Sequence, residues 1–357
     1  MYFLGMGTAV PATRYLQTEG WESVRTTPAF ATLRPRSQAI LRKVLLGDNG
    51  IESRHLALAS LEEAYAVDPD TLHQRFRQHA PDLATAAARQ ALADARLDPG
   101  EVDAVVATTC TGYLCPGLTS FLAERLGLRR TIVGLDLVGL GCGAALPALQ
   151  VAQAYLRSGL ARRVLVVCAE VCSAAFYLDD DPGVLISACL FGDGAAAAVL
   201  ASEPVPHTRS VRWHSWNTRL EPADREKLRF ETCRGMLRNI LTLEVPSLAA
   251  RHAGEVCDEL LAREGLDRSV IREWILHAGG RDVLNALQRR WSLTDSALRH
   301  SAGVLREHGN LSSPSVLFAL AAARAEAPEP GWWWLSSFGA GFTCHGALLE
   351  VGKLPQY

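Results

Sequence analysis

Short apolar runs alternate with helix-like runs through the N-terminal half of the chain, and this alternation constrains the fold most strongly. The expected strands are 102–109, 132–140 and 164–169, and the expected helices are 118–126 and 146–156. Asp82 is the expected N-cap of a further, alanine-rich helix that ends before Pro99. Nearly continuous apolar strands are typical of a sheet that is covered on both faces. The pattern therefore predicts an α/β fold with a largely buried sheet.

The two halves of the chain repeat short patterns in the same order. The run 102–112 has a counterpart at 271–280, and each is a strand ending in a small-residue turn. The segments 191–194 (FGDG) and 338–341 (FGAG) each precede an apolar run near the end of a half. We expect two similar halves, 1–205 and 206–357, which meet at a polar, arginine-rich segment around 203–230. A chance match of short glycine turns is the alternative.

Cys142 lies where the apolar run 132–140 turns, through three glycines, into a helix-like run. Glycine lets the backbone bend sharply and lets a substrate approach closely. A helix start carries positive partial charge and unpaired N–H groups, which favour a thiolate over a thiol. These features predict a nucleophile, and a cysteine with only a packing role is the alternative.

Two further polar residues occupy similar places. His277 follows an apolar, strand-like run, and Asn310 precedes an expected helix with Ser313 as its N-cap and Pro314 as its first residue. In α/β sheets, ligands bind at the carboxyl ends of the strands, so we expect both residues to lie near Cys142 as a catalytic group. A structural histidine and an asparagine that marks a turn are the alternatives.

Composition excludes several classes of protein. The 357 residues carry 36 Lys and Arg against 38 Asp and Glu, so the basic surplus of a nucleic-acid-binding protein is missing. We find neither an apolar run long enough to span a membrane nor the pattern of a signal peptide. The nine cysteines are scattered without a CxxC pair, which indicates reduced thiols in the cytoplasm and neither a disulfide framework nor a zinc site.

Four segments in order resemble one enzyme family. They are GCGAALPAL around Cys142, LFGDGAAA around Phe191, LHAGGRDVL around His277 and GNLSSPSVLF around Asn310. Together with GTAVPA, GIESRHL and TGYLCPGLTSFLAERLGL, they resemble the type III polyketide synthases, the chalcone synthase-like branch of the thiolase-fold condensing enzymes. The resemblance implies a thiolase-like α/β fold. Its two βαβαβαββ-type halves would build five α-β-α-β-α layers.

The resemblance also implies an activity. Cys142 would accept an acyl group from coenzyme A, and malonyl-CoA would decarboxylate to an enolate that extends the chain. Release would give a cyclised pyrone, resorcinol or related polyketide. His277 would support the thiolate and, with the Asn310 amide, donate hydrogen bonds to the thioester oxygen. No metal or redox cofactor is implied, and the partners would be acyl-CoA, malonyl-CoA and a second copy of the chain in a homodimer.

The resemblance also suggests five candidate substrate-contacting residues. Phe191 would steer malonyl decarboxylation and separate the CoA tunnel from the cavity, and a core phenylalanine before a turn is the alternative. Asn239 stands near an aromatic position of the family and Cys189 is a small residue before Phe191, so we expect an altered tunnel that accepts medium or long aliphatic starters. Cys115 would cross the dimer interface and line the partner's cavity, and a simple X-Pro turn beside a buried thiol is the alternative. Lys43 would meet the CoA phosphates, although a solvated basic turn is the alternative.

Three other functions compete with this interpretation. A ketoacyl synthase III-like or long-chain acyl-condensing enzyme would perform a single condensation. A dinucleotide-binding protein is suggested by GLGCGA at 139–144, but its acidic partner should come about 20 residues later, and Glu170 comes about 30 residues after Gly141. A non-catalytic thiolase-like subunit is disfavoured because Cys142, His277 and Asn310 are all present.

Overall fold

A computed structural model describes residues 1–65, 68–204, 210–326 and 330–352. Its strands are β1 Tyr2–Ala9, β2 Arg14–Leu16, β3 Ser53–His55, β4 Ala104–Thr108, β5 Val133–Leu137, β6 Arg163–Glu170, β7 Gly194–Ala201, β8 Val211–Leu220, β9 Leu228–Cys233, β10 Met236–Leu241, β11 Ile271–Leu276, β12 Gly331–Gly339 and β13 Thr343–Val351. Its α-helices are α1 Gln17–Val24, α2 Pro28–Thr32, α3 Pro35–Leu46, α4 Pro69–Ala95, α5 Leu118–Leu126, α6 Ala145–Arg157, α7 Pro182–Leu190, α8 Val245–Glu264, α9 Arg281–Trp291, α10 Arg299–His308 and α11 Ser315–Ala325.

The strand order confirms the internal duplication. Hydrogen bonds among the described strands give the order β11-β12-β13-β8-β1-β7-β6-β4-β5. Outward from the central β8–β1 contact, each half adds two antiparallel neighbours and then a parallel one: β1-β7-β6-β4 on one side and β8-β13-β12-β11 on the other. The strands β7 and β13 follow the two repeated FGxG segments. The expected boundary between residues 205 and 206 lies outside the described residues.

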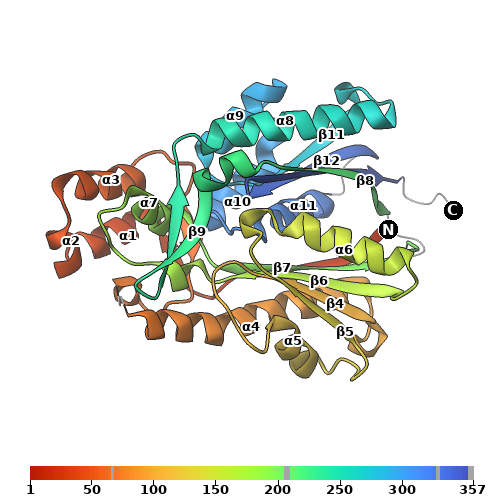
Figure 1. Ribbon diagram of the computed structural model, residues 1–357, viewed down its shortest axis with the longest axis horizontal. Coiled ribbons are helices and arrows are strands. Elements are labelled where there is room, and N and C mark those ends of the chain that lie inside the picture. Colours follow the sequence, from red (N-terminus) through yellow and green to blue (C-terminus); the bar gives the residue numbers. More distant parts are fainter. Residues whose placement is uncertain (66–67, 205–209, 327–329, 353–357) are drawn as a thin grey trace.

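The layers follow from the alternation of side chains along the strands. In β6, Val164 and Val166 point into the central core between the two halves of the sheet, whereas Leu165 and Val167 point outward onto α4 and α5. In β12, Trp333 faces the central core and Trp334 faces α8 and α9. Figure 1 shows the resulting five layers, with α6, α10 and α11 between the two halves of the sheet. The thiolase-like α/β fold is confirmed.

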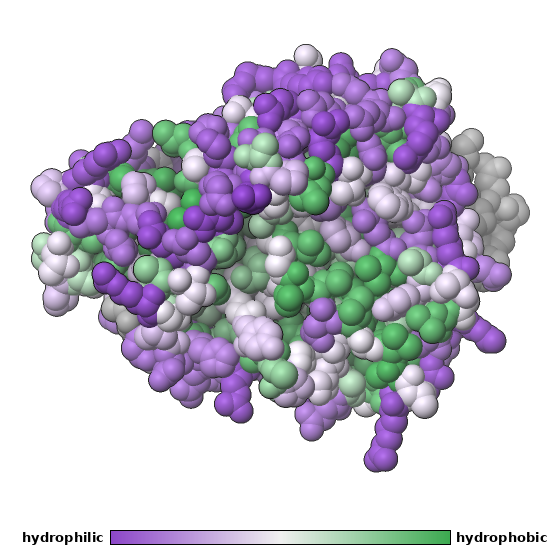
Figure 2. Space-filling view, in the orientation of Figure 1, coloured by the Kyte–Doolittle hydropathy of each residue, from purple (hydrophilic) through white to green (hydrophobic). Residues whose placement is uncertain are grey.

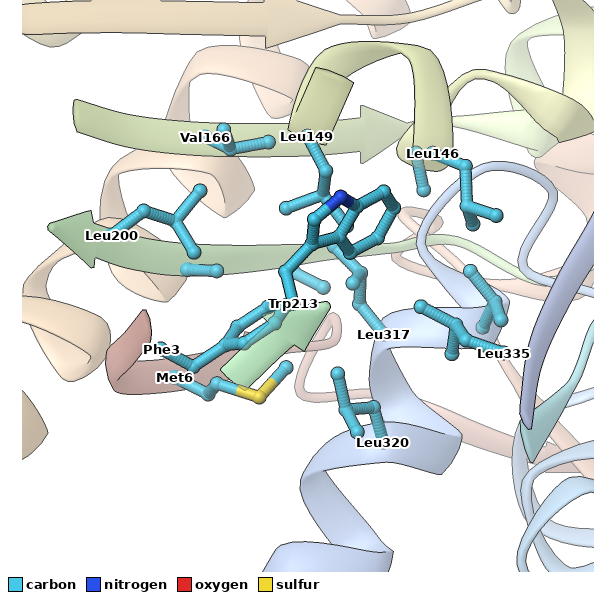
Figure 3. Close-up of a cluster of buried hydrophobic side chains, with 14 of the residues drawn as sticks. Phe3, Met6, Leu146, Leu149, Val166, Leu200, Trp213, Leu317, Leu320 and Leu335 are labelled. Atoms are coloured by element: carbon cyan, nitrogen blue, oxygen red, sulfur yellow. The ribbon is translucent and has the colours of Figure 1, made fainter. Parts of the chain in front are cut away.

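The central core is large and apolar. Leucines from α6 and α11 surround the buried ring of Trp213, which also packs near Phe3 and Met6 of β1 (Figure 3). Helices α6 and α11 each bury one face against each half of the sheet. This packing fixes the N-terminal ends of both helices. Cys142 lies just before α6 in the sequence, and Asn310 lies just before α11.

Three local expectations are wrong. Helix α4 begins at Pro69 with Asp68 as its N-cap, and it continues through Pro81 past the expected start at Asp82, because one face stays buried along its length. The strand expected to reach residue 140 ends at Leu137, since Gly139 and Gly141 adopt positive φ angles of 81° and 58° that turn the chain.

The third correction concerns the start of α11. Pro314 is the N-cap, and Ser313 does not cap the helix. The Ser313 hydroxyl instead donates to the carboxylate of Glu170 at 2.5 Å. Elsewhere, within the residues described, no helix is long and apolar enough to cross a membrane.

Candidate active site

Cys142 lies in a one-turn 3₁₀ helix, Gly141–Gly143, between β5 and α6, and its side chain is buried. This turn packs against the end of β12 from the other half of the chain. A Cβ atom on Gly143 would lie 3.1 Å from backbone atoms of Phe338 and Gly339. The glycine therefore permits the close approach that brings Cys142 to the second half of the molecule.

His277 lies at the end of β11, where its backbone N–H donates to the carbonyl of Ser336 at 2.9 Å. Its ring meets the ring of Phe338 edge to face at 5.0 Å between centroids. The backbone of Phe338 contacts the Cys142 turn, so this one residue links the histidine to that turn. The imidazole is 1% exposed, and neither ring nitrogen has a hydrogen-bond partner among the described groups. Both nitrogens are free to serve a substrate.

Asn310 is fixed on both sides of its amide. The NH₂ group donates to the carbonyl of Gly279 at 3.1 Å, and the side-chain oxygen accepts from the backbone N–H of Ser312 at 2.8 Å. Its backbone pairs with the residues that flank Phe191, Leu190 and Gly192, at 2.9 and 3.0 Å. One N–H of the amide remains available, and the asparagine is tied both to the His277 loop and to Phe191.

A serine that the sequence analysis missed connects these groups to the cysteine. The hydroxyl of Ser312 donates to the Cys142 sulfur at 3.2 Å. Because the backbone N–H of Ser312 donates to the Asn310 side chain, this one residue contacts both the thiol and the amide. Phe191 belongs to the same buried cluster as Cys142, with Leu56 and Phe176 also in it. The structure therefore places Cys142, Asn310 and Phe191 together, and His277 beside their loops.

The hydrogen-bond network continues behind Ser312 to a buried carboxyl group. Cys110 lies 3.3 Å from the Ser312 hydroxyl and 3.4 Å from Glu170. Glu170, at the end of β6, also accepts from Thr109, Thr111 and Ser313. In the sequence, the only sign that Ser312 belongs to the site is its position two residues after Asn310. The only sign for Glu170 is that it is a polar residue at the end of an expected strand.

Burial dominates the protonation of the site. It raises the pKa of the Cys142 thiol to about 12, against the lowering effect of the Ser312 hydroxyl, with the nearby Glu170 carboxyl raising it further. Burial lowers the pKa of His277 to about 4. We expected the helix start to favour the thiolate of Cys142. This expectation is wrong for the enzyme without substrate, because the desolvation of the buried anion raises the pKa more than the helix end lowers it. Proton transfer from thiol to imidazole would form opposite charges that stabilise each other.

The remaining predicted residues lie in several places. Asn239 is buried on β10 and its amide donates to Ser187 of α7 at 2.8 Å, while its carbonyl oxygen has no partner in the described structure. Cys189 packs among the side chains that join α7 to α1 and α3, and not in the Cys142 cluster. Lys43 is exposed on α3, and Cys115 is exposed before α5.

The dinucleotide interpretation does not fit these contacts. Glu170 would have to present its carboxylate to a ribose, but it is fully buried and occupied by hydroxyl, thiol and backbone donors. In the part of the chain that the structure covers, no group of three or more His, Cys, Asp or Glu side chains is arranged to hold a metal ion.

Comparison with known proteins gives the same family for both halves. The model of the FAE1/Type III polyketide synthase-like protein family matches residues 32–218, and that of the chalcone and stilbene synthases, C-terminal domain, matches residues 227–351. The 3,5-dihydroxyphenylacetyl-CoA synthase of Amycolatopsis balhimycina is 31% identical, over 98% of this chain and 92% of the relative. The 1,3,6,8-tetrahydroxynaphthalene synthase of Streptomyces peucetius subsp. caesius is 31% identical, over 96% and 91%.

Solved structures agree with these matches. The crystal structure of 1,3,6,8-tetrahydroxynaphthalene synthase from Streptomyces coelicolor A3(2), a bacterial type III polyketide synthase, superposes with a TM-score of 0.89 at 26% identity. The match covers 99% of this chain and 100% of that one. With both family models, full-length relatives and the fold in agreement, the chain belongs to the type III polyketide synthase family and is a condensing acyltransferase.

Proposed function

We propose that Cys142 carries the growing acyl chain, that His277 is its base, and that His277 and Asn310 stabilise the oxyanions. One observation carries this proposal: a single loop holds the Asn310 amide and donates a hydroxyl hydrogen bond to the Cys142 sulfur, beside a histidine whose two ring nitrogens have no partner among the described residues. A nucleophile, a base and oxyanion donors are the groups that acyl transfer requires.

In the loading step, the Cys142 sulfur attacks the carbonyl carbon of an acyl-CoA and its proton passes to the imidazole. The tetrahedral intermediate then breaks its bond to CoA, which leaves with that proton as the free thiol. The imidazole and the thiol start neutral, because burial disfavours both charged forms. The proton transfer is therefore coupled to substrate binding, and the imidazolium that it forms donates a hydrogen bond to the oxyanion of this step.

In the extension step, malonyl-CoA loses CO₂ and leaves an enolate whose oxygen accepts hydrogen bonds from His277 and Asn310. The enolate carbon attacks the thioester on Cys142, forming a carbon–carbon bond and freeing the cysteine. Removing one oxyanion donor typically costs about 100- to 1,000-fold in rate. Phe191 would border this reaction, since it packs with Cys142 and its neighbours pair with Asn310.

The product of repeated extension is a cyclised polyketide. Relatives named for 3,5-dihydroxyphenylacetyl-CoA and 1,3,6,8-tetrahydroxynaphthalene support this statement. We further propose that the substrates are an aliphatic acyl-CoA of medium or long chain and malonyl-CoA, that no cofactor beyond these thioesters is required, and that the enzyme works in the cytoplasm. Lys43 and Cys115 remain proposed contacts for CoA phosphates and for the partner's cavity.

We also propose a homodimer through the face that carries β5. This strand is the last in the sheet order, so its outer edge is unpaired among the described strands. Figure 2 shows hydrophobic side chains gathered on the face where α5 and α6 lie in Figure 1. Tyr113, before α5, is 69% exposed and Val138, after β5, is 58% exposed. Apolar surface beside an open strand edge suits a self-complementary interface.

The test is to incubate the purified enzyme with acyl-CoAs from C4 to C18, with an aromatic acyl-CoA and with carbon-13-labelled malonyl-CoA. Products whose masses show two or more labelled extensions, and which are at least one water lighter than the corresponding linear polyketide acid, support the proposal. Cys142→Ala is the control and should give no product. Products that stop at one extension would instead favour a ketoacyl synthase III-like enzyme, and the absence of any labelled product would refute the proposal.

A further inference from the structure

The segment that carries Phe191 is held by an unusual set of hydrogen bonds. Four successive carbonyl oxygens, those of residues 188–191, accept from groups outside α7. Arg54 donates to Ala188 at 2.7 Å and to Phe191 at 2.8 Å. Gln17 donates to Cys189, and the backbone N–H of Asn310 donates to Leu190, both at 2.9 Å. The last carbonyls of a helix have no partners within it, so these donors fix how α7 ends.

The arginine in this set is buried without a carboxylate. Arg54 is 6% exposed and makes no ion pair with any described residue. Its Nε donates to the side-chain oxygen of Gln17 at 2.9 Å. Its guanidinium lies 5.8 Å from the centre of the ring of Phe176, a residue of the buried cluster that holds Cys142. Burying a cation without a direct ion pair is costly. Here neutral oxygens and a ring contact the guanidinium, and the Asp193 carboxyl stabilises its charge only at longer range.

The stem of the same arginine supports the segment before Asn310. Gly309 has a φ angle of 71°, and a Cβ atom there would lie 2.6 Å from the carbonyl of Leu190 and 2.9 Å from Cγ of Arg54. The chain therefore packs directly on the arginine as it approaches Asn310. One side chain thus touches the two segments that present Phe191 and Asn310.

Strand β3, which carries Arg54, also bonds to both segments through its neighbours. The carbonyl of His55 accepts from the N–H of Asp193 at 2.8 Å, and the hydroxyl of Ser53 donates to the carbonyl of Glu307 at 2.9 Å. Consecutive residues of this short strand therefore join the segment after Phe191 to the helix before Asn310. Arg54 stands in the middle of this connection.

We propose that Arg54 is a positioning residue for malonyl-CoA decarboxylation, because it sets the separation of Phe191 and Asn310 through their backbones. The inference rests on the proposed function, in which these two residues act at that step. It does not extend to the loading of Cys142, since the thiol is held by Ser312 and by its own glycine turn. Loss of Arg54 should therefore impair decarboxylation more than acylation.

The conservative variant Arg54→Lys tests this directly. A lysine keeps the charge but presents a compact ammonium in place of the planar fork that reaches Gln17, Ala188 and Phe191 together. We measure single-turnover acylation of Cys142 by intact-protein mass, and CO₂ release from labelled malonyl-CoA with kcat and KM. A misplacement of about 1 Å can cost about 100-fold, so decarboxylation should fall about 10- to 100-fold in kcat, with acylation close to wild type.

The matched control is Arg75→Lys. Arg75 is a second buried arginine that bridges two carbonyls, those of Ser173 and Glu63, both at 2.7 Å. It should lower the melting temperature by a similar amount without separating the two activities. If Arg54→Lys fails to fold, Gln17→Met decides: it removes the acceptor of the Arg54 Nε and should separate the activities in the same direction.

Equal loss of both activities in the folded variant, or no loss of either, would overturn the positioning role. A separation of the same size in Arg75→Lys would overturn it as well. If the wild-type protein neither acylates Cys142 nor decarboxylates malonyl-CoA, the proposed function itself is refuted, which is a different result.

Discussion

Removing the Ser312 hydroxyl should make Cys142 harder to ionise. That hydroxyl donates to the sulfur at 3.2 Å and is the largest influence that lowers the pKa of the thiol. A hydrogen bond to a charged group is worth about 1.5–3 kcal/mol. At about 1.36 kcal/mol per pKa unit, its loss in Ser312→Ala raises the pKa and reduces the thiolate population about 10- to 100-fold at fixed pH.

The assay is the rate at which iodoacetamide alkylates Cys142 between pH 7 and 10, read by peptide mass. Ser312→Ala should react about 10- to 100-fold more slowly than the wild type at pH 8, in proportion to the lost thiolate. Ser313→Ala is the control, because the neighbouring hydroxyl donates to Glu170 and not to the sulfur. Alkylation of Ser312→Ala at the wild-type rate or faster would refute the assigned hydrogen bond.

Three further predictions follow from the site and its surroundings. His277→Ala should lose both acylation and malonyl-CoA decarboxylation, whereas Asn310→Ala should acylate nearly normally and decarboxylate about 100-fold more slowly, by intact mass and CO₂ release; equal losses in Asn310→Ala would contradict this division. Burial lowers the pKa of His345 to about 4 from its ordinary 6.5, so the unfolded chain protonates first as the pH falls and stability is lost between pH 6.5 and 4. By pH 5 His345 alone has lowered the free energy of unfolding by about 2 kcal/mol. In urea unfolding, the free energy of unfolding of His345→Gln should therefore fall less between pH 7.5 and 5 than that of the wild type, and an equal fall would contradict the prediction. Asn239→Phe should shorten the preferred acyl-CoA starter in a C4 to C18 series, because each buried methylene is worth about 0.8 kcal/mol, and a flat profile or a preference for aromatic starters would refute the idea.

Local patterns predicted most of the fold. The helix α5 spans the expected residues, and β4 and β6 lie within the expected runs or one residue beyond them, because apolar runs of that length are buried wherever they lie. The errors at β5 and α4 arose where glycine turns or a helical proline compete with the apolar pattern. The repeated FGxG segments predicted the duplication because each marks the turn into an equivalent strand.

The site was predictable only in part, for a physical reason. A glycine-flanked cysteine at a strand end is visible in the sequence because its signal is local. The Ser312 hydroxyl reaches a cysteine 170 positions away, and Arg54 reaches the carbonyl of Phe191 across 137 positions. Serine and arginine carry no local mark of such contacts. The same holds for Glu170, whose donors come from two segments, around Cys110 and at Ser313, that are far from each other in the sequence.

The most direct test of the account is where the acyl group goes. After incubation with a medium-chain acyl-CoA and no malonyl-CoA, intact-protein mass should show one acyl adduct, and peptide mapping should place it on Cys142, which is one of nine free cysteines. Cys142→Ala should show none. An adduct that persists in Cys142→Ala, or that maps to Cys110 or any other cysteine of the wild type, would contradict the central claim.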